Sequence, residues 1–522
     1  MRVSVLKAFP SRSIVIATNR LVSMSKTFCI IIVSLIAALS QSSCFLRSFS
    51  EGVSDTAAPA QGYQSLEKFP FKEAWYGMYF QEDKVGYSHF KIDPSGENFV
   101  VSNESYMRLT AMKKTNEIDM KEKVKVRPDL SMISFESDVV MNGKKLHMTG
   151  QTKADKFVVE IAVDGEKLDR EFPLEQKLYH SSAISLMPAL RGLTDGAAYT
   201  FSVFNAEKQG LDRIEQTISA VAGTPGPQGA VWKAKNAYGR TVVFSWLNKK
   251  GQTVIEKALN GSLVTVLEDE AAARKFAEKK TLGKDLVLDF SLIKVEKPIL
   301  NPEKARFLKV KMQGIEKSAI PEDGRQTVTA EANSPTHDFY VTIKTENVGV
   351  PGQPGAFQHT ESSLPEFLAS TVSVQSNHQE IIQQAERIVK PNDSRRDKIE
   401  KLLHWTAENI ARKMQDSFTS LAVLRSKEGE CQSHANLYTA LARSQKIPSR
   451  VVTGLVYSDK VGFLYHAWVE SYDNGWIAVD PTSDQIPADA THIKVYTGES
   501  PDNTQLLFQI MGKLKIDVVE FR

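Results

Sequence analysis

The sequence has very little cysteine. Its three cysteines among 522 residues are Cys29, Cys44 and Cys431, and the first two lie in or beside an apolar N-terminal segment. The rest of the chain therefore keeps one thiol and cannot hold a disulfide framework. Such a thiol is either a small buried hydrophobic group or a reactive one, and the residues around it must decide between the two.

The chain also lacks an excess of charge of one sign. Lys and Arg total 65, Asp and Glu total 62, and the formal net charge is +3 at pH 7. This balance gives no support to a nucleic-acid partner or to an anionic surface as partner of the whole chain. The length predicts about three domains, at roughly 150 residues each. No internal repeat with a period of about 20 to 50 residues is visible.

The apolar N-terminal run is short. It extends from Phe28 to Leu39 and follows Lys26. A helix that spans a bilayer needs about 20 residues, whereas the apolar part of a signal peptide has about 7 to 15. We therefore expect residues 1–44 to be a signal peptide or a membrane anchor. The body of the protein is then exported, to the periplasm or the cell envelope, and meets the membrane only through this segment.

Cys44 is a candidate for lipid attachment. It follows Ser42 and Ser43, as in the lipid-modified cysteine of bacterial lipoproteins, but Gln41 stands where that motif prefers Leu. Cleavage by an ordinary signal peptidase and retention as an anchor are the open alternatives. Residues 45–65 are small, polar and aperiodic, which is typical of a flexible linker.

Most of the remaining chain has a β pattern. Residues 66–280 contain runs of aromatic and β-branched residues, with Asn142-Gly143 and Asp164-Gly165 between two pairs of such runs. These dipeptides favour tight hairpin turns, so we predict a β-rich domain with an antiparallel meander. A second strand-rich stretch, residues 285–350, ends in a Pro/Gly-rich segment and is predicted to be a small separate β-domain.

The period changes after this segment. Residues 366–522 first carry apolar side chains at helical spacing and then, after Pro448, return to strand-like runs. Helices followed by an antiparallel sheet predict an α+β domain. The fold class expected for the whole chain is therefore α+β multidomain, with a β-rich N-terminal region and a C-terminal α+β domain.

Cys431 lies at the predicted start of a helix. At that place the unpaired backbone N–H groups and the helix dipole stabilise a thiolate. The nearby Glu428 and Glu430 would oppose it, so a cationic partner is needed. A thiol nucleophile requires a base that becomes this cation and a third group that orients the base.

A hairpin downstream offers both groups. His466 and Asp480 flank the turn Asp473-Asn474-Gly475. If the hairpin is centred on Asp473, the two residues are directly opposed across the ladder, at a Cβ separation of about 4.5 to 5.5 Å. A bulge at Gly475 would shift this register by one residue. In either register the hairpin predicts a local His–Asp pair.

These residues carry a family resemblance. The blocks "GECQSHANLYTALARSQKIPSRVVTGLVY" and "YHAWVESYDNGWIAVDPT", in this order, resemble the transglutaminase-like superfamily, with its papain-like fold and Cys–His–Asp triad. The resemblance implies Cys431 as nucleophile, His466 as general base and acid, and Asp480 as the orienting carboxylate. Gln432 stands where the animal enzymes have Trp, and no acidic calcium loop is present, so we expect no cofactor and no calcium-dependent cross-linking.

The implied reaction is acyl transfer at an amide bond of a protein or a cell-envelope peptide, by a peptidase, an amidase or a transamidase. Backbone N–H groups at the helix start, that of Cys431 included, would stabilise the oxyanion. The alternative is a catalytically silent binding or scaffold protein of the cell envelope. Either way the expected partners are proteins, peptides or other envelope components.

Several nearby side chains have a functional interpretation and a plainer one. Gln432, Trp468 and Trp476 are candidates to line a substrate cleft, but aromatic residues in strands more often pack in a core. His434 could join Cys431 and His466 in a zinc site, although a fourth ligand is missing. We therefore predict no metal site and a partly exposed His434. His404 and His492 have no evident partner in the sequence.

Overall fold

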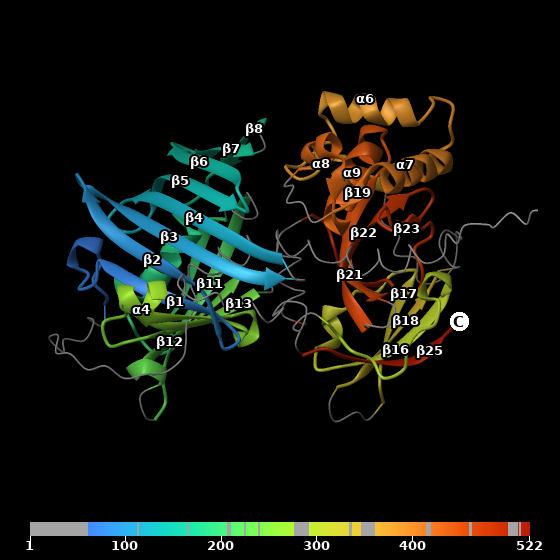
Figure 1. Ribbon diagram of the computed structural model, residues 1–522. Helices are drawn as coiled ribbons and strands as arrows, with labels where there is room; N and C mark the ends of the chain where they lie inside the picture. Colours follow the sequence, from blue (N-terminus) through green and yellow to red (C-terminus); the bar gives the residue numbers. More distant parts are fainter. Residues whose placement is uncertain are drawn as a thin grey trace, which may run out of the picture. The chain divides into compact units, whose positions relative to one another are not determined.

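Figure 1 shows a computed structural model of the chain. The structure describes residues 61–111, 114–163, 166–205, 210–223, 226–238, 241–275, 292–332, 337–345, 361–413, 419–458, 462–499, 510 and 513–522. The expected signal peptide or anchor, the lipidation candidate Cys44 and most of the expected linker lie outside these residues. In the described ranges no helix has the length and apolar character needed to cross a membrane.

The chain forms two compact units. The N-terminal unit contains the described residues from 61 to 275, and the C-terminal unit contains residues 292–498 and 514–522. The N-terminal unit is built on a sheet, whereas the C-terminal unit combines helices with two four-stranded sheets. The predicted α+β multidomain class, with a β-rich N-terminal region, is confirmed.

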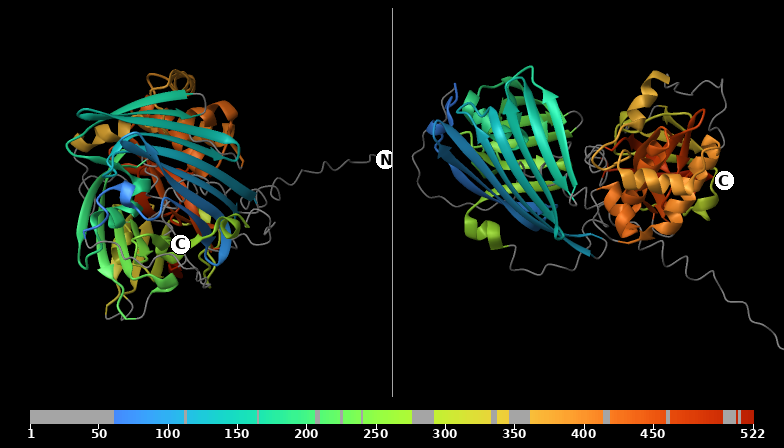
Figure 2. Two further views of the ribbon diagram at one scale, coloured as in Figure 1. Left: turned by 90° about the vertical axis from the view of Figure 1, so that its left-hand side faces the viewer. Right: turned by 90° about the horizontal axis from the view of Figure 1, so that it is seen from above.

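One sheet of fifteen strands makes up most of the N-terminal unit. The neighbours run in the order β8-β7-β6-β5-β4-β3-β2-β1-β15-β14-β13-β12-β11-β10-β9, and the strand pairs are antiparallel except for β9 with β10. The sheet is strongly curved (Figure 2). The strand bounds are β1 Glu73–Phe80, β2 Asp83–Ser95, β3 Asn98–Ala111, β4 Lys114–Val126, β5 Met132–Met141, β6 Lys144–Lys153, β7 Lys156–Val163, β8 Glu166–Pro173, β9 Leu178–His180, β10 Ala198–Asn205, β11 Gly210–Ala220, β12 Trp232–Tyr238, β13 Thr241–Leu247, β14 Thr253–Ala258 and β15 Leu263–Glu268.

This sheet is the predicted meander. Asn142 and Gly143 form the turn between β5 and β6 with φ values of +50° and +85°, the positive values that Asn and Gly tolerate best. The second predicted turn, at positions 164 and 165, lies outside the described residues, but the strands on either side of it are paired. Two short helices, α3 (Met187–Arg191) and α4 (Glu270–Arg274), belong to the same unit.

A row of buried polar side chains crosses one face of this sheet. The row contains four cross-strand pairs that are also hydrogen-bonded through their side chains: Asn103 with Glu122, Ser88 with Ser105, Ser245 with Glu256, and Gln216 with Asn236. Apolar side chains such as Met107 and Met120 flank the row and form the core around it. The polar groups bond one another across the strands, which is how a sheet can bury them at low cost.

The first sheet of the C-terminal unit combines distant parts of the chain. Its strands are β16 (Phe307–Gln313), β17 (Gln326–Ala330), β18 (Phe339–Lys344) and β25 (Lys515–Phe521), in the order β17-β18-β16-β25. The predicted small separate β-domain differs from this arrangement. Its fourth strand comes from the chain end, and the sheet belongs to the same compact unit as the helices. The local sequence of β25 carries no signal for a partner about 200 residues earlier.

Four helices precede the second sheet. They are α6 (Gln379–Ile388), α7 (Arg395–Asn409), α8 (Ser420–Ser426) and α9 (Cys431–Ser444). A capping box marks the start of α7: the Ser394 side chain accepts from the Asp397 amide, and the Asp397 side chain accepts from the Ser394 amide. Helix α9 is buried along nearly its whole length and packs against α6, α7, α8 and the second sheet.

The second sheet has the order β23-β22-β21-β24 and is antiparallel. Its strands are β21 (Ser449–Ser458), β22 (Gly462–Tyr472), β23 (Trp476–Val479) and β24 (Ile493–Thr497). A short parallel pair joins β19 (Ala411–Arg412), which follows α7, to β20 (Glu428–Gly429), which lies just before α9 in the chain. The predicted order of helices followed by an antiparallel sheet is the observed one. Figure 1 shows β22 next to α9 in the core of this unit.

Candidate active site

Cys431 is the first residue of α9, as the sequence predicts. Its side chain is 1% exposed. The helix packs with this end against β22, where the Tyr465 hydroxyl donates to the Gln432 side-chain oxygen at 3.4 Å. Since Gln432 follows Cys431 and Tyr465 precedes His466, this contact places the start of α9 beside the strand that carries the histidine.

Glu430 caps the helix that Cys431 starts. Its carboxylate accepts from the amides of Gln432 and Ser433, both at 2.9 Å, and from the Ser433 hydroxyl at 3.0 Å. The Cys431 Sγ lies 3.5 Å from the same carboxylate. A negative charge so close opposes formation of a thiolate, which is the effect expected of Glu430 from the sequence.

This cap also corrects the predicted oxyanion site. The amides of Gln432 and Ser433 already donate to Glu430, so they cannot also serve a substrate oxyanion while the cap is in place. Of the helix-start N–H groups named from the sequence, that of Cys431 stays a candidate. The sequence could not show this, because Glu is not among the most common helix-capping residues.

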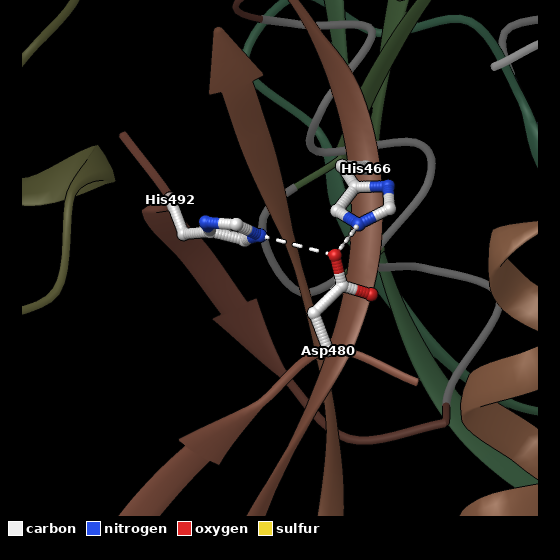
Figure 3. A group of neighbouring side chains, drawn as sticks. All are labelled: His466, Asp480 and His492. Carbon is white, nitrogen blue, oxygen red and sulfur yellow. Dashed lines mark hydrogen bonds and ion pairs between the residues drawn. The ribbon is translucent and has the colours of Figure 1, made fainter. Parts of the chain in front are cut away.

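The structure brings His466 and Asp480 together. His466 Nε2 lies 3.0 Å from Asp480 Oδ2, and both side chains are buried (Figure 3). The other ring nitrogen, Nδ1, is turned away from the carboxylate. A neutral His466 that donates through Nε2 to Asp480 therefore keeps Nδ1 as the atom that can accept a proton.

The predicted register of this hairpin is wrong by two residues. Tyr472 pairs with Trp476 and Val469 with Val479, so the hairpin is centred on Asn474 and not on Asp473. Asn474 has a φ of +56°, and it forms the tip of the turn. Asp480 follows the last residue of β23 and reaches His466 diagonally, a contact that cross-strand neighbours two residues apart allow.

Asp480 accepts several hydrogen bonds. The Thr482 amide donates to Oδ1 at 2.9 Å, and the Ser483 hydroxyl donates to Oδ2. His492 Nε2 lies 3.4 Å from Oδ2. Burial would raise the pKa of Asp480, but the charges of His466 and His492 and their hydrogen bonds hold it well below its usual range. The carboxylate is therefore ionised at neutral pH.

His492 is the residue that the sequence reasoning missed. It lies between Asp480 and Asp489, and Nδ1 is 3.2 Å from Asp489 Oδ1. Burial alone would lower the pKa of His492, but the two carboxylates raise it to about 9. An irregular segment separates His492 from β23, so no strand or helix pattern in the sequence indicated its position. His404, also without an evident partner in the sequence, is paired with Asp484 at 2.6 Å.

Of the two interpretations of Trp468, its contacts support packing in the core. Trp468 is 1% exposed and belongs to a core cluster with Val452, Ala478 and Ala488. Its ring is stacked with that of His466, at 6.2 Å between centroids, and meets the ring of His492 edge-on at 5.2 Å. Trp468 therefore supports the two histidines from the core side.

The other two cleft candidates are partly exposed. Trp476 packs edge-on against Phe367 at 5.1 Å, and the Arg450 guanidinium lies 4.0 Å from its ring centroid. Gln432 donates through Nε2 to Asn436 at 2.9 Å, one turn further along α9. Of these two, Gln432 adjoins the thiol. Trp476 begins β23 at the hairpin end and pairs with Tyr472, which lies six residues beyond His466 on β22.

His434 differs from its prediction. It is fully buried, not partly exposed, and its ring nitrogens face the carbonyl oxygens of Glu430 at 2.7 Å and of Ile410 at 3.1 Å. Burial lowers the pKa of His434, so the neutral ring donates to one of these carbonyls and its other nitrogen only faces the second. Among the described residues, Cys431, His434 and His466 do not form a group whose ligand atoms lie within 4.8 Å of one another, so the zinc site is not supported. The position of His434 ties the start of α9 to the end of α7.

One group of side chains, which includes the His466–Asp480 pair, has the spacing of a metal site. His466, Asp480 and His492 offer ligand atoms that all lie within 4.8 Å of one another. Both Nε2 atoms face the same carboxylate oxygen as hydrogen-bond partners, and a protonated His492 has no lone pair for a metal. This donor set fits a hydrogen-bonded cluster better than a metal centre, so we assign no metal to it.

The site residues fall within a match to a protein family. Residues 382–481 match the family model described as the transglutaminase-like superfamily, and this range contains Cys431, His466 and Asp480. An uncharacterized protein of Mycobacterium leprae (strain TN) is 27% identical over 113 aligned residues, and the match covers 19% of this chain and 39% of that protein.

Two solved structures are also similar. A candidate cysteine protease from Cytophaga hutchinsonii is 16% identical, with a TM-score of 0.26, over 41% of this chain and 85% of its own. A β-barrel-like protein with a domain of unknown function from Brucella abortus is 12% identical, with a TM-score of 0.29, over 38% of this chain and 95% of its own. At such low TM-scores neither similarity supports a conclusion about this chain. In its C-terminal part, over residues 382–481, the chain is thus similar to the transglutaminase-like superfamily.

Proposed function

We propose that the transglutaminase-like domain catalyses thiol-dependent acyl transfer at an amide bond of a protein or a cell-envelope peptide. The observation that carries this proposal is the buried His466–Asp480 hydrogen bond, 3.0 Å long, on the strand against which the Cys431 end of α9 packs. A nucleophile, a base and an orienting carboxylate then come from a helix start and one hairpin.

The reaction begins with proton transfer from the Cys431 thiol to His466 Nδ1. The thiolate attacks the amide carbon, and the carbonyl oxygen becomes an oxyanion next to the Cys431 N–H. His466 returns its proton to the leaving amine, and a thioester forms on Cys431. Attack by water or by a second amine releases the acyl group and regenerates the thiol. Asp480 keeps Nε2 protonated, so that Nδ1 is the basic atom throughout.

A silent binding or scaffold role is the second candidate. Glu430 favours it, because its carboxylate lies 3.5 Å from the Cys431 sulfur and opposes the thiolate. An ion pair with a protonated His466 would have to outweigh this repulsion for catalysis to occur. The two candidates therefore differ in one property, the reactivity of the thiol near neutral pH.

The place of action is also a proposal. The N-terminal segment supports export to the periplasm or the cell envelope, with cleavage, lipid attachment at Cys44 or retention as an anchor as alternatives. The N-terminal unit would then bind the substrate or an envelope component. An envelope-binding assay with the full chain and with a chain that lacks residues 66–280 tests this role. Equal retention of both would exclude it.

Thiol labelling tests the reaction. In a chain with Cys29→Ser and Cys44→Ser, an acyl or alkyl thiol probe reports on Cys431 alone. We expect labelling at about pH 6, well below the ordinary cysteine range, and its loss in His466→Ala. His147→Ala, in the N-terminal unit, is the matched histidine control and should label like the parent. Labelling that starts only above about pH 8.5 and ignores His466 would support the scaffold role instead.

A further inference from the structure

His492 has a carboxylate on each side of its ring. Nε2 lies 3.4 Å from Asp480 Oδ2, and Nδ1 lies 3.2 Å from both Oδ1 and the carbonyl oxygen of Asp489. Figure 3 shows the ring of His492 approaching Asp480 from the side opposite His466. Ionised carboxylates only accept hydrogen bonds, and the negative charge on each side of the ring favours a form that donates at both nitrogens. That form of the ring is the imidazolium cation.

We propose that His492 is a positioning residue of the thiol site, a buried imidazolium that fixes the carboxylate of Asp480 and thereby the ring of His466. This role rests on the proposed function, because it acts through the base of that reaction. The chain of contacts runs from His466 to Asp480, then to His492 and Asp489, with charges of alternating sign when the base is protonated.

The segment that carries His492 is held from several sides. Asp489 Oδ1 accepts from the Thr491 amide at 2.9 Å and from its hydroxyl at 2.6 Å. The Arg325 guanidinium, at the start of β17, donates to the carbonyl oxygens of Ala488, at 2.6 Å, and Asp489. The first sheet of the C-terminal unit thus anchors the segment, which gives this sheet a part in the geometry of the site.

The charges around His492 favour its cationic form. Asp480 and Asp489 contact it directly, while His466 lies 5.5 Å away between ring centroids, and Arg325 lies on the far side of the Asp489 backbone. Trp468 meets the ring edge-on and keeps water from that side. With a pKa raised to about 9 by the two carboxylates against the effect of burial, His492 stays charged across the physiological range.

Ring NMR tests the charge directly. In the full chain with ¹⁵N-labelled histidine, the His492 signals are assigned by their loss in His492→Gln. We expect both ring nitrogens to be protonated from pH 6 to beyond pH 8. Asp489→Asn removes one carboxylate without changing its size and should lower the titration midpoint of His492 by at least about one pH unit. A neutral ring at pH 7 in the unsubstituted chain would overturn the proposal.

Alkylation kinetics test the positioning role. In His492→Gln the rate of Cys431 alkylation at pH 7 should fall at least about tenfold, and the pH profile should move up by about one unit. It moves up because the loss of a cation makes neighbouring groups hold their protons to higher pH. His404→Gln, which removes the partner of the exposed Asp484, is the control and should leave the profile in place.

The outcomes separate this inference from the proposed function. If Cys431 reacts normally and His492→Gln leaves both rate and profile unchanged, the positioning role is wrong and the acyl-transfer proposal stands. If the thiol of the unsubstituted chain is inert, both are wrong. Should His492→Gln fail to fold, Asp489→Asn carries the same kinetic test. At pH values above the lowered titration midpoint of His492 the ring is neutral in this variant, so the pH profile of Cys431 alkylation should again move up.

Discussion

The carboxylate of Glu430 lies 3.5 Å from the sulfur of Cys431 while it caps the helix that this cysteine begins. One residue thus stabilises the helix and opposes ionisation of the proposed nucleophile. The helix dipole and the carboxylate act on the thiol in opposite directions, and in the proposed reaction a protonated His466 would favour the thiolate.

Replacing Glu430 by Gln should make the thiol more reactive. The two carboxylate oxygens accept from one amide each, and the single oxygen of Gln can replace only one of them, so we expect the weaker cap to cost about 1 to 2 kcal/mol of stability, but the negative charge is gone. We expect alkylation of Cys431 at pH 7 to be about three- to tenfold faster. Glu428→Gln, which removes a carboxylate paired with Lys413, is the control. An unchanged rate in Glu430→Gln would mean that the carboxylate does not restrain the thiol.

Replacing Asp480 by Asn should disable the base. The side chain keeps its size, but it no longer stabilises a protonated His466 and can present an N–H to Nε2, which reverses the tautomer. We expect the alkylation rate at pH 7 to fall on the order of 100-fold, together with a loss of thermal stability, because Asp480 also pairs with the buried His492. Asp484→Asn alters the exposed carboxylate four residues further on and should leave the rate within about twofold. Equal rates in both variants would show that Asp480 does not act through His466.

Local patterns predicted the parts of the fold that depend on local chemistry. The Asn142-Gly143 turn, the helix that begins at Cys431 and the order of helices before strands follow from turn chemistry and from hydrophobic period. Pairings between distant segments left no such signal. Neither the β1–β15 pair of the N-terminal sheet nor the addition of β25 to the first sheet of the C-terminal unit could be predicted from a period within one strand.

The candidate site shows the same division. His466 and Asp480 flank one turn, so the sequence predicted that they would be neighbours, although the turn centre is one residue later and the register two residues off. His492 reaches Asp480 through an irregular segment held by Arg325 from a different sheet. Contacts of this kind depend on packing between distant segments, which local sequence does not reveal.

Stability of the C-terminal unit should depend on pH at both ends of the range. The pKa of Asp489 is lowered to about 2, because the charge and hydrogen bond of His492 and the hydrogen bonds from Thr491 outweigh burial. Its contribution of about 2 kcal/mol is present above the unfolded value of about 3.9 and is lost as the pH falls toward 2. For His492, with a raised pKa, the contribution is complete below about 6.5 and is lost as the pH rises through about 9.

Calorimetry from pH 2 to 10 checks this dependence. The unfolding temperature of the C-terminal unit should be highest between about pH 4 and pH 6.5 and fall on both sides. In Asp489→Asn the unfolding temperature should change less steeply with pH on both sides. The variant lacks the aspartate that titrates on the acid side, and the pKa of His492 is raised less on the alkaline side. An alkaline slope that is the same in this variant would contradict the pairing of His492 with Asp489.

Removing Arg325 should weaken the site from a distance. Its buried guanidinium donates to the carbonyl oxygens of Ala488 and Asp489, so Arg325→Met leaves two buried acceptors without their donor. Each such loss costs about 1 to 3 kcal/mol, and we expect a total loss of about 2 to 4 kcal/mol in the free energy of unfolding. Arg395→Met, at the exposed start of α7, should change it by less than about 0.5 kcal/mol.

The same variant separates anchoring from general stability. Because the segment from Ala488 to His492 loses the hydrogen bonds from Arg325, Cys431 alkylation should slow several-fold in Arg325→Met even well below the unfolding temperature. Arg325→Lys restores one donor and should recover part of the rate. A variant that is destabilised but alkylated at the full rate would mean that the sheet stabilises the unit without positioning its histidines.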